Sequence, residues 1–527
     1  MGFNIVTFAR LCRSGWTFVR EGVPNLLAPP DPPPGPAFVL RVLKAFERRP
    51  EPGVDTGARL SNALQRMGPS YIKLGQFLAT RADVVGRDMA RELGNLQDSL
   101  PPFSEDAARK AVESALGRPI EEMFESFGPP VAAASIAQVH KAEMKGDDGS
   151  VRSVAVKVLR PGVQHRFNRD LKSFYMAARL IERFHPPSRR LRPVAVVDTL
   201  AASVELEMDL RMEAAALSEM GENTANDPGF RVPNVEWQHI AKNVLVLEWI
   251  DGIKLWKHED LAAAGHDLPA IGANVIQSFL RHAIRDGFFH ADMHPGNLFV
   301  EPDGTLVAVD LGIMGRLTKA ERKFLAEILF GFIRRDYLRV SRLHFDAGYV
   351  PPDKDVELFA QSLRAIGEPI HGQSASDISM AKLLTQLFEN TERFGMETRT
   401  ELILLQKTMV VVEGVGRSLD EEFDMWRVSE PVVRDWIEKN LGPAGVLRDT
   451  ADGIGTIGRL VRELPMLAER AETLSNEIQE MGRNGLRFDA ATADAIGRAE
   501  ARHTRSGRIA LWIGAVSLAA IALKMVL

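Results

Sequence analysis

Three polar residues in the middle of the chain have side chains and spacing suited to phosphate chemistry. Asp292 and Asn297 lie five positions apart in the segment His-Ala-Asp-Met-His-Pro-Gly-Asn, and Asp310 follows a short apolar run and precedes Leu-Gly. In proteins Mg²⁺ takes oxygen ligands and is commonly held beside phosphates by one or two carboxylates. The carboxylate of Asp310 and the amide oxygen of Asn297 are therefore candidate Mg²⁺ ligands.

The same residues resemble the active-site motifs of protein kinases in spacing and order. In the kinase catalytic loop, the residue matching Asp292 orients the nucleophile and the residue matching Asn297 holds a metal ion. Asp310 takes the place of the metal-binding Asp of Asp-Phe-Gly, although an Asp-Leu-Gly triplet by itself carries little weight. Upstream, Val-Ala-Val-Lys ends at Lys157 and resembles the strand whose lysine reaches the ATP phosphates. A strand lysine is ordinarily solvated, but this order of motifs favours an ATP and Mg²⁺ site.

The segment before that lysine departs from ordinary kinases. Where they carry a Gly-rich loop, this chain reads Val-Ala-Ala-Ala-Ser-Ile-Ala-Gln-Val-His. The Cβ atoms of alanine restrict positive φ and limit how closely a backbone wraps phosphate. We therefore expect a nucleotide to be held differently here. The candidate nucleotide contacts are Ala132, Ala133, Ala134, Ser135, Lys157 and Glu248.

Two further motifs indicate a particular family. Gly-Pro-Ser-Tyr-Ile-Lys-Leu-Gly-Gln carries Lys73 and Gln76, which by spacing alone would form a solvated polar patch on one helix face. Glu207 and Asp209 form a Glu-x-Asp motif after the lysine strand. Together with the alanine-rich loop, these motifs resemble the UbiB family of atypical kinase-like proteins over roughly residues 60–320.

The resemblance implies roles for residues that spacing leaves undefined. It implies that the helix carrying Lys73 covers the active-site cleft as a lid, and that Lys73 meets Glu207 and Asp209. It also implies an ion pair between Lys157 and Glu213, which makes Asp292, Lys157 and Glu213 the candidate catalytic set. The implied process is ubiquinone biosynthesis, by ATP hydrolysis or phosphorylation of a small molecule. The implied partners are ATP, membrane lipids or quinone precursors, and other ubiquinone-biosynthesis proteins.

Two alternative functions remain beside this one. A protein kinase is less favoured, because no Ala-Pro-Glu occurs in the chain and residues 311–317 run directly into a predicted helix from 318. A nucleotide-sensing, lipid-binding scaffold without turnover is also less favoured. The residues whose loss would mark such a scaffold are all retained, namely Lys157, Asp292, Asn297 and Asp310.

These motifs require an α+β architecture, a two-lobed protein-kinase-like fold with added helices at both ends. Strands are expected at 131–140, 154–159, 243–249 and 306–309, with mostly helical chain before 128 and after 318. The expected organisation is an N-terminal segment with a stiff Pro-rich linker (1–36), a helical extension (37–128), a kinase-like domain (129–445), a helical region (446–507) and a transmembrane helix (508–527).

Both ends of the chain are candidates for membrane contact. The 19 residues from 509 to 527 would span about 28 Å as a helix, are apolar on all sides and follow four arginines. This predicts a single-pass anchor in the inner (cytoplasmic) membrane with the rest facing the cytoplasm, the alternative being a buried helix. Residues 3–20 are interrupted by arginines and are no signal peptide. They predict either a helix packed on the protein, which is favoured, or a membrane-surface helix.

Bulk composition excludes other classes. Hydrophobic residues make up 45% and charged residues 26% of the chain, as in folded globular proteins. The net charge of −5 gives no support to nucleic-acid binding. A single cysteine, Cys12, allows no internal disulfide, and no Cys/His cluster has zinc spacing.

Overall fold

The computed structural model describes residues 5–26, 34–48, 56–79, 100–146, 149–184, 191–371, 393–396 and 400–441, with 85, 89, 92, 93, 96 and 189. Contacts divide the chain into Met1–Glu438, which holds nearly all of these residues, and Lys439–Leu527. The predicted helical region at 446–507 and transmembrane helix at 508–527 lie outside the described residues. Within the described ranges, every helix is too short or too polar to cross a bilayer.

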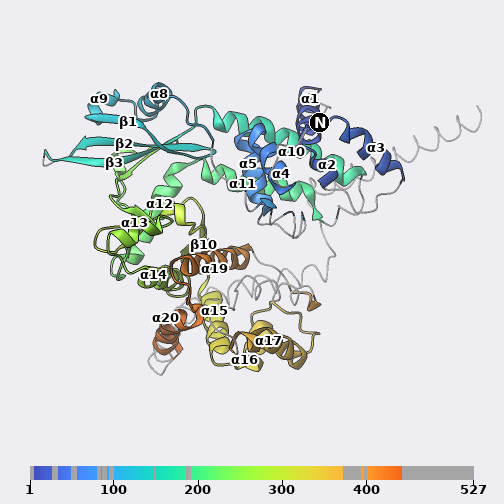
Figure 1. The fold of residues 1–527 in the computed structure, drawn as a ribbon, viewed down its shortest axis with the longest axis vertical. Coiled ribbons are helices and arrows are strands. Elements are labelled where there is room, and N and C mark those ends of the chain that lie inside the picture. Colours follow the sequence, from blue (N-terminus) through green and yellow to red (C-terminus); the bar gives the residue numbers. More distant parts are fainter. Residues whose placement is uncertain are drawn as a thin grey trace, which may run out of the picture. The chain divides into compact units, whose positions relative to one another are not determined.

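The N-terminal part is helical, as expected (Figure 1). It contains α1 (Ile5–Arg20), α2 (Val23–Leu26), α3 (Pro34–Lys44), α4 (Thr56–Met67) and α5 (Pro69–Ala79). The predicted linker is wrong at 34–36, because these residues form the first turn of α3. Proline is tolerated in the first turn of a helix, since an N–H there would have no acceptor within the helix. Gly75 lets α5 approach α4, since a Cβ there would lie 2.7 Å from the Leu64 side chain.

A four-stranded antiparallel sheet follows, in the order β1-β2-β3-β5. Its strands are β1 (Ser126–Ala133), β2 (Ala137–Lys145), β3 (Val151–Leu159) and β5 (Val244–Glu248). Helices α8 (Glu105–Leu116) and α9 (Ile120–Met123) pack on one face around a buried apolar cluster. The single strand predicted over 131–140 is wrong: β1 ends, turns and continues as β2 there, with Ala133 opposite Gln138. The turn consists of Ala134, Ser135 and Ile136 and lacks the Gly, Pro or Asn that usually marks a turn, so the residue pattern was interpreted as one continuous strand.

Three helices connect β3 to β5. They are α10 (Val163–Phe184), α11 (Pro193–Glu207) and α12 (Leu210–Thr224). The N-cap of α12 is Asp209, whose side chain accepts from the N–H of Arg211. The apolar residues of all three helices join those of α4 and α5 in the main core, so that these helices and the second lobe share one packed interior.

The second lobe contains two small sheets and its own helices. One sheet has the order β4-β9-β8-β6, and β7 pairs with β10 in the other. The strands are β4 (Phe230–Arg231), β6 (Ile253–Lys254), β7 (Phe288–His290), β8 (Leu298–Val300), β9 (Leu306–Ala308) and β10 (Met314–Arg316). Short 3₁₀ helices form at η2 (Trp237–His239) and η4 (Pro295–Asn297), and the α-helices are α13 (His258–Ala263) and α14 (Leu268–Leu280). The π-helical segment η3 (Arg281–Asp286) continues α14 and leads into β7.

Helices complete the described part of the chain. They are α15 (Lys319–Ile333), α16 (Tyr337–Asp346), α17 (Val356–His371), α19 (Thr400–Leu419) and α20 (Met425–Leu441). The helix predicted from 318 is confirmed, with Thr318 and Glu321 forming a capping box at the start of α15. Helix α19 packs closely on α14, where a Cβ on Gly272 would lie 3.4 Å from the backbone of Gly416.

Candidate nucleotide-binding site

Three predicted site residues meet between the two lobes. The Lys157 ammonium, on β3, donates to both carboxylate oxygens of Glu213 at 2.7 and 2.9 Å. It also lies 3.2 Å from Oδ2 of Asp310, which follows β9. Glu213 sits in the first turn of α12, and its side chain is only 5% exposed. The tertiary structure thus brings together a lysine, its buried partner and the candidate metal carboxylate.

The pKa values of this cluster depend on burial and on the central lysine. Burial raises the pKa of Glu213 to about 7, because the Lys157 ammonium only partly offsets the desolvation. For Lys157, burial acts to lower the pKa, but the carboxylates of Asp310 and Glu213 outweigh it and raise the pKa. Burial would also raise the pKa of Asp310, yet Lys157 and the Gly312 N–H lower it to about 2. Near neutrality Asp310 is therefore ionised, as a metal ligand must be, while Glu213 titrates.

Hydrogen bonds to backbone groups hold the predicted catalytic loop in place. Nδ1 of the buried His290 accepts from the N–H of Asp292 at 3.0 Å. The Asn297 amide donates to the backbone oxygen of Asp292 at 3.3 Å, and the N–H of Val309 donates to the backbone oxygen of Asn297 at 3.0 Å. The last bond ties the loop to the residue just before Asp310. Both candidate Mg²⁺ ligands therefore lie on segments that are hydrogen-bonded to each other.

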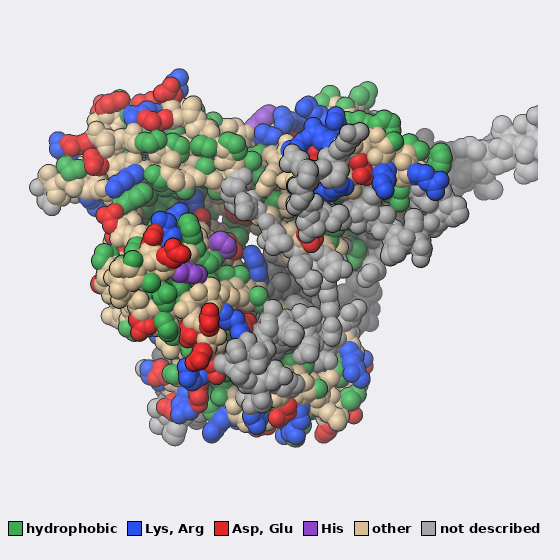
Figure 2. Space-filling view, in the orientation of Figure 1, with side chains coloured by type: hydrophobic (Ala, Val, Ile, Leu, Met, Phe, Trp, Pro, Cys, Tyr) green, Lys and Arg blue, Asp and Glu red, His purple; other side chains and the backbone are tan. Residues whose placement is uncertain are grey.

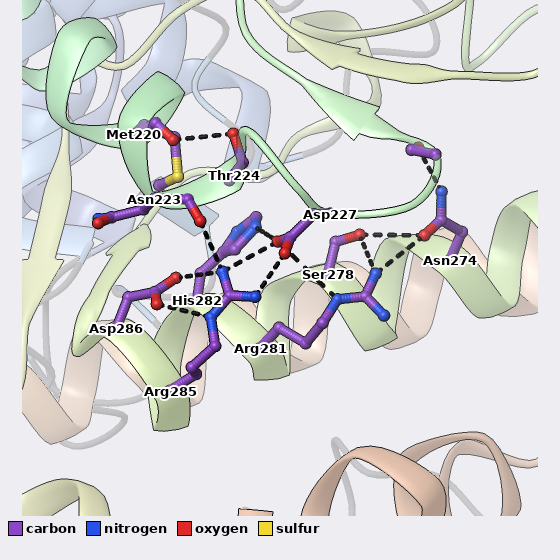
Figure 3. A network of polar contacts seen from close by, with 11 residues as sticks. Met220, Asn223, Thr224, Asp227, Asn274, Ser278, Arg281, His282, Arg285 and Asp286 are labelled. Atoms are coloured by element: carbon purple, nitrogen blue, oxygen red, sulfur yellow. Dashed lines mark hydrogen bonds and ion pairs between the residues drawn. The ribbon is translucent and has the colours of Figure 1, made fainter. Parts of the chain in front are cut away.

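A buried polar network supports the segment before this loop (Figure 3). Asp227, between α12 and β4, accepts from both terminal nitrogens of Arg285 and lies 3.4 Å from Nε2 of His282. Burial lowers the pKa of His282. Burial would raise the pKa of Asp227, but its bonds to His282 and Arg285 outweigh that and lower it. His282 and Arg285 lie on η3, and π-helical turns often accompany functional sites. The network joins the chain after α12, which carries Glu213, to the turn that leads into the catalytic loop.

The structure adds a residue that the sequence did not single out. Lys407, on α19, donates from its ammonium to Oδ1 of Asp292 at 3.3 Å. The two residues are 115 positions apart, so no local pattern relates them. The sequence contained one indication of Lys407, which is a charged residue within an apolar stretch. Lys407 and Glu413 are the only charged residues between 402 and 416.

The predicted lid contact is present in part. The Lys73 side chain on α5 is 10% exposed, and its ammonium lies 2.5 Å from Oε2 of Glu207 at the end of α11. Asp209 binds the Arg211 guanidinium, at 2.6 Å from Oδ2, and this hydrogen bond lowers the pKa of Asp209 even though burial acts against it. Its contact with Lys73 stays a prediction. Gln76 is half-buried one turn after Lys73, and its role also stays a prediction.

The alanine-rich loop is a tight turn with ordinary backbone angles. Ala132 and Ala133 end β1, while Ala134 and the fully buried Ser135 form the turn. In the described part of the chain the non-glycine residues with positive φ are Arg192 and Arg335, so none is in this loop. The Arg160 guanidinium donates to the backbone oxygen of Ala134 at 2.8 Å. The turn is thus pinned from the end of β3, close to Lys157.

Glu248 ends β5, and its carboxylate already has partners. It accepts two hydrogen bonds from Arg231, at 3.0 and 2.8 Å, and one from the Asn234 amide at 2.9 Å. Burial would raise the pKa of Glu248, but these bonds lower it. Arg231 also binds Glu301. The carboxylate therefore ties β5 to β4, and its predicted contact with a nucleotide stays a prediction.

The donor set fits Mg²⁺ bound together with phosphates. No group of three or more His, Cys, Asp or Glu residues that could hold a metal occurs among the described residues. Asp310 and Asn297 instead offer one ionised carboxylate and one amide, on segments fixed to each other. Mg²⁺ is commonly held this way, with phosphate oxygens and water completing the coordination.

Comparisons with known proteins identify the family of this chain. The model of the ABC1 atypical kinase-like domain matches residues 95–344, and that of the UbiB helical domain matches 363–424. A relative from Marinobacter nauticus named "Probable protein kinase UbiB" is 38% identical over 467 residues, 88% of this chain and 84% of its own. Relatives of the same name from Aeromonas salmonicida and Aeromonas hydrophila are each 36% identical, over 96% and 97% of this chain and 92% and 93% of their own. The solved complex of Rv3197 with erythromycin from Mycobacterium tuberculosis aligns with a TM-score of 0.48 and 23% identity, over 75% of this chain and 97% of that one. On the family models and these relatives, this chain belongs to the UbiB family of atypical kinase-like proteins.

Proposed function

We propose that this chain binds Mg-ATP between its lobes and transfers the γ-phosphoryl group to a small molecule or to water at a membrane. Membership in the UbiB family makes it a kinase-like protein that acts in ubiquinone biosynthesis. The observation that carries the proposal is the position of Lys157, which lies between buried Glu213 and ionised Asp310. Active kinases hold their phosphate-binding lysine in a similar arrangement.

Each residue has a defined task in this proposal. Lys157 binds the α- and β-phosphates, and Glu213 holds its ammonium in position. Asp310 and Asn297 hold Mg²⁺, which neutralises charge on the phosphates. Asp292 orients the acceptor hydroxyl or water and accepts its proton. The acceptor oxygen then bonds to the γ-phosphorus as the bond from that phosphorus to the bridging oxygen breaks, leaving ADP.

The chain after Asp310 supports a small acceptor. Met314 already pairs with His290 as β10 joins β7, and α15 starts at Lys319. This leaves little room for the long activation segment on which kinases seat a peptide. The relatives are named as probable protein kinases, so a protein acceptor is the second candidate. The lid formed by Lys73 and Glu207 would have to open for it.

Substitution of the metal carboxylate tests the proposal. Asp310→Asn keeps the size of the side chain but removes the charge that Mg²⁺ needs. We expect a loss of phosphate release of about a hundredfold or more, and loss of the thermal stabilisation by Mg-ATP. Asp353→Asn is the matched control, because Asp353 is exposed and far along the chain. Unchanged turnover together with retained stabilisation in Asp310→Asn would refute the assignment.

A further inference from the structure

A second cavity lies among the N-terminal helices and α10. It has a volume of about 320 Å³ and is lined by residues of α1, α4, α5 and α10. Figure 2 shows Lys and Arg side chains gathered over the place where Figure 1 labels α1 and α10. Among its described lining residues Asp170 is the one carboxylate. The arginines that line the cavity are Arg10, Arg13, Arg66, Arg166 and Arg169.

Two of these arginines are held in place by the protein. The buried Asp170 accepts from the Ser70 hydroxyl at 2.8 Å and lies 3.5 Å from Nε of Arg169 and 4.0 Å from Nε of Arg166. Arg166 also donates to the backbone oxygen of Met67 at 3.0 Å. Nε of Arg169 is buried and reaches no hydrogen-bond acceptor in the described structure. The guanidinium groups are thus positioned in advance, and one buried donor is left unused.

The other arginines of the cavity carry positive charge that the described carboxylates do not fully balance. Within the described part of the chain, neither Arg10 nor Arg13 has an ion-pair partner. Arg66 lies 3.2 Å from Glu21 and is half exposed. Arginines spread over a surface need no partner, but these converge from three helices on one half-open cavity. Their mutual repulsion favours a bound anion.

We propose that this arginine cavity binds a phosphate or diphosphate group. The planar guanidinium donates pairs of hydrogen bonds that match phosphate oxygens, which makes arginine the preferred residue for such groups. The hydroxyls of Ser14 and Tyr71 are hydrogen-bonded to each other at 2.5 Å, so the pair supplies one further donor at the cavity wall. Burial raises the pKa of Tyr71, so its hydroxyl keeps its proton at neutral pH. The volume is at the small end of ligand sites and suits a headgroup rather than a whole nucleotide.

The phosphate can belong to a lipid headgroup or to a soluble molecule. The neighbouring surface favours the lipid. Helix α1 exposes Ile5 at 75% and Trp16 at 48%; Phe38 of α3 is 63% exposed, and Phe46, in the turn after α3, is 50% exposed. Large apolar side chains beside a basic cluster are typical of helices that lie on a membrane surface.

The first experiment measures the site with a soluble probe. Pyrophosphate is titrated calorimetrically into the full-length protein in the presence of Mg²⁺ and a non-hydrolysable ATP analogue, which occupies the nucleotide site. We expect saturable binding that weakens about tenfold or more in the double variant Arg10→Gln/Arg13→Gln. Arg342→Gln, an exposed arginine on α16, is the matched control and should bind like wild type. Equal melting temperatures show that the double variant is folded.

The second experiment separates the two sources of phosphate. Vesicles of phosphatidylcholine, with or without phosphatidylglycerol, are floated with the full-length protein, and the increase in flotation caused by phosphatidylglycerol is measured, because the predicted anchor contributes to both kinds of vesicle. Loss of phosphatidylglycerol-dependent flotation in the double variant assigns the cavity to a lipid headgroup. Weaker pyrophosphate binding with unchanged flotation assigns it to a soluble phosphate. Double-variant behaviour equal to wild type in both experiments would overturn the proposal, whatever the outcome at Asp310.

Discussion

At the scale of single residues, two lysines mark the two ends of the proposed transfer. Lys157 lies at the side of the phosphates, beside Asp310, and Lys407 lies at the side of the acceptor, beside Asp292. A cation next to Asp292 can stabilise negative charge that develops on the transferred group. Lys407 is 43% exposed, so it remains free to turn toward a bound phosphate.

Removing this second cation should slow turnover more than it weakens binding. We expect Lys407→Met to lower kcat about tenfold or more, while KM for ATP changes less, because Lys157 makes the ground-state contacts. Lys323→Met is the matched control, as an exposed lysine on α15. Steady-state phosphate release measures both constants. A rise in KM at constant kcat would assign Lys407 to nucleotide binding, and no change in either would remove it from the site.

The buried acid of the same cluster should make stability depend on pH. The folded-state pKa of Glu213 is raised to about 7 by burial, above its ordinary value of 4.5. The folded protein therefore holds this proton more tightly than the unfolded chain, and the stability it contributes is complete at pH 4.5 and below and is lost as pH rises to 7. Asp310 has its pKa lowered to about 2, so it gives the opposite trend. Its contribution to the stability of the folded protein is lost only as the pH falls toward 2.

Glu213→Gln should remove this pH dependence, because glutamine stays neutral. Between pH 5 and pH 8 the melting temperature of wild type should fall relative to that of Glu213→Gln by a few degrees. Glu222→Gln, an exposed residue of the same helix, controls for general pH effects. A constant difference between wild type and Glu213→Gln across this range would contradict the raised pKa.

At the scale of elements, the turn between β1 and β2 sets how the backbone meets phosphate. Its alanines have negative φ, and Arg160 holds the carbonyl of Ala134. We expect Ala133→Gly to change ATP affinity severalfold, with tighter binding favoured because glycine permits a closer backbone approach. Binding by titration calorimetry is the measurement. Ala264→Gly, at the end of α13, controls for the added chain entropy, and equal affinities would mean that the alanines do not restrain the nucleotide.

The helix pair α5 and α11, joined by the ion pair of Lys73 and Glu207, is the proposed lid. Removing one partner of a buried ion pair leaves an uncompensated charge, at a cost of about 3–5 kcal/mol when the pair is fully buried. Lys73 and Glu207 are 10% and 15% exposed, so Lys73→Ala should lower the melting temperature and loosen α5. We also expect self-phosphorylation, seen as incorporation of radiolabelled phosphate from ATP. Absence of labelling in a folded Lys73→Ala protein would show that the lid does not restrain transfer.

At the scale of the whole molecule, the proposed site needs both family domains. Lys157, Asp292 and Asp310 lie within residues 95–344, whereas Lys407 lies within 363–424. Because α19 packs on α14, the C-terminal helices deliver their lysine to the catalytic loop through a shared apolar interface. The second domain therefore contributes a residue to the proposed site.

Attachment to the membrane is the remaining prediction for the entire chain. Deleting residues 509–527 should move most of the protein from the membrane pellet to the supernatant, since the segment is apolar on all sides and long enough to span. Fractionation with immunoblotting at high salt is the measurement. A truncated protein that stays fully in the pellet would place the anchor elsewhere, with residues 3–20 as the next candidate. Unfolding of the truncated protein would favour a buried helix.

The sequence by itself determined the parts of this protein that depend on local order. The motifs around Lys157, Asp292 and Asp310 indicated the fold class, and the helix expected from 318 is present as α15. The ion pair of Lys157 with Glu213 was anticipated from family resemblance and is formed. The turn within 131–140 was missed because its residues carry no turn preference.

Only the tertiary structure decided which distant side chains meet. Lys407 reaches Asp292 across 115 positions. Residues of four helices line the half-open arginine cavity, and its first and last lining residues, Arg10 and Asp170, are 160 positions apart. Glu248 proved to be bound by Arg231. Each contact depends on how apolar helix and strand faces pack, and periodicity shows that a face is apolar without showing which face it packs against.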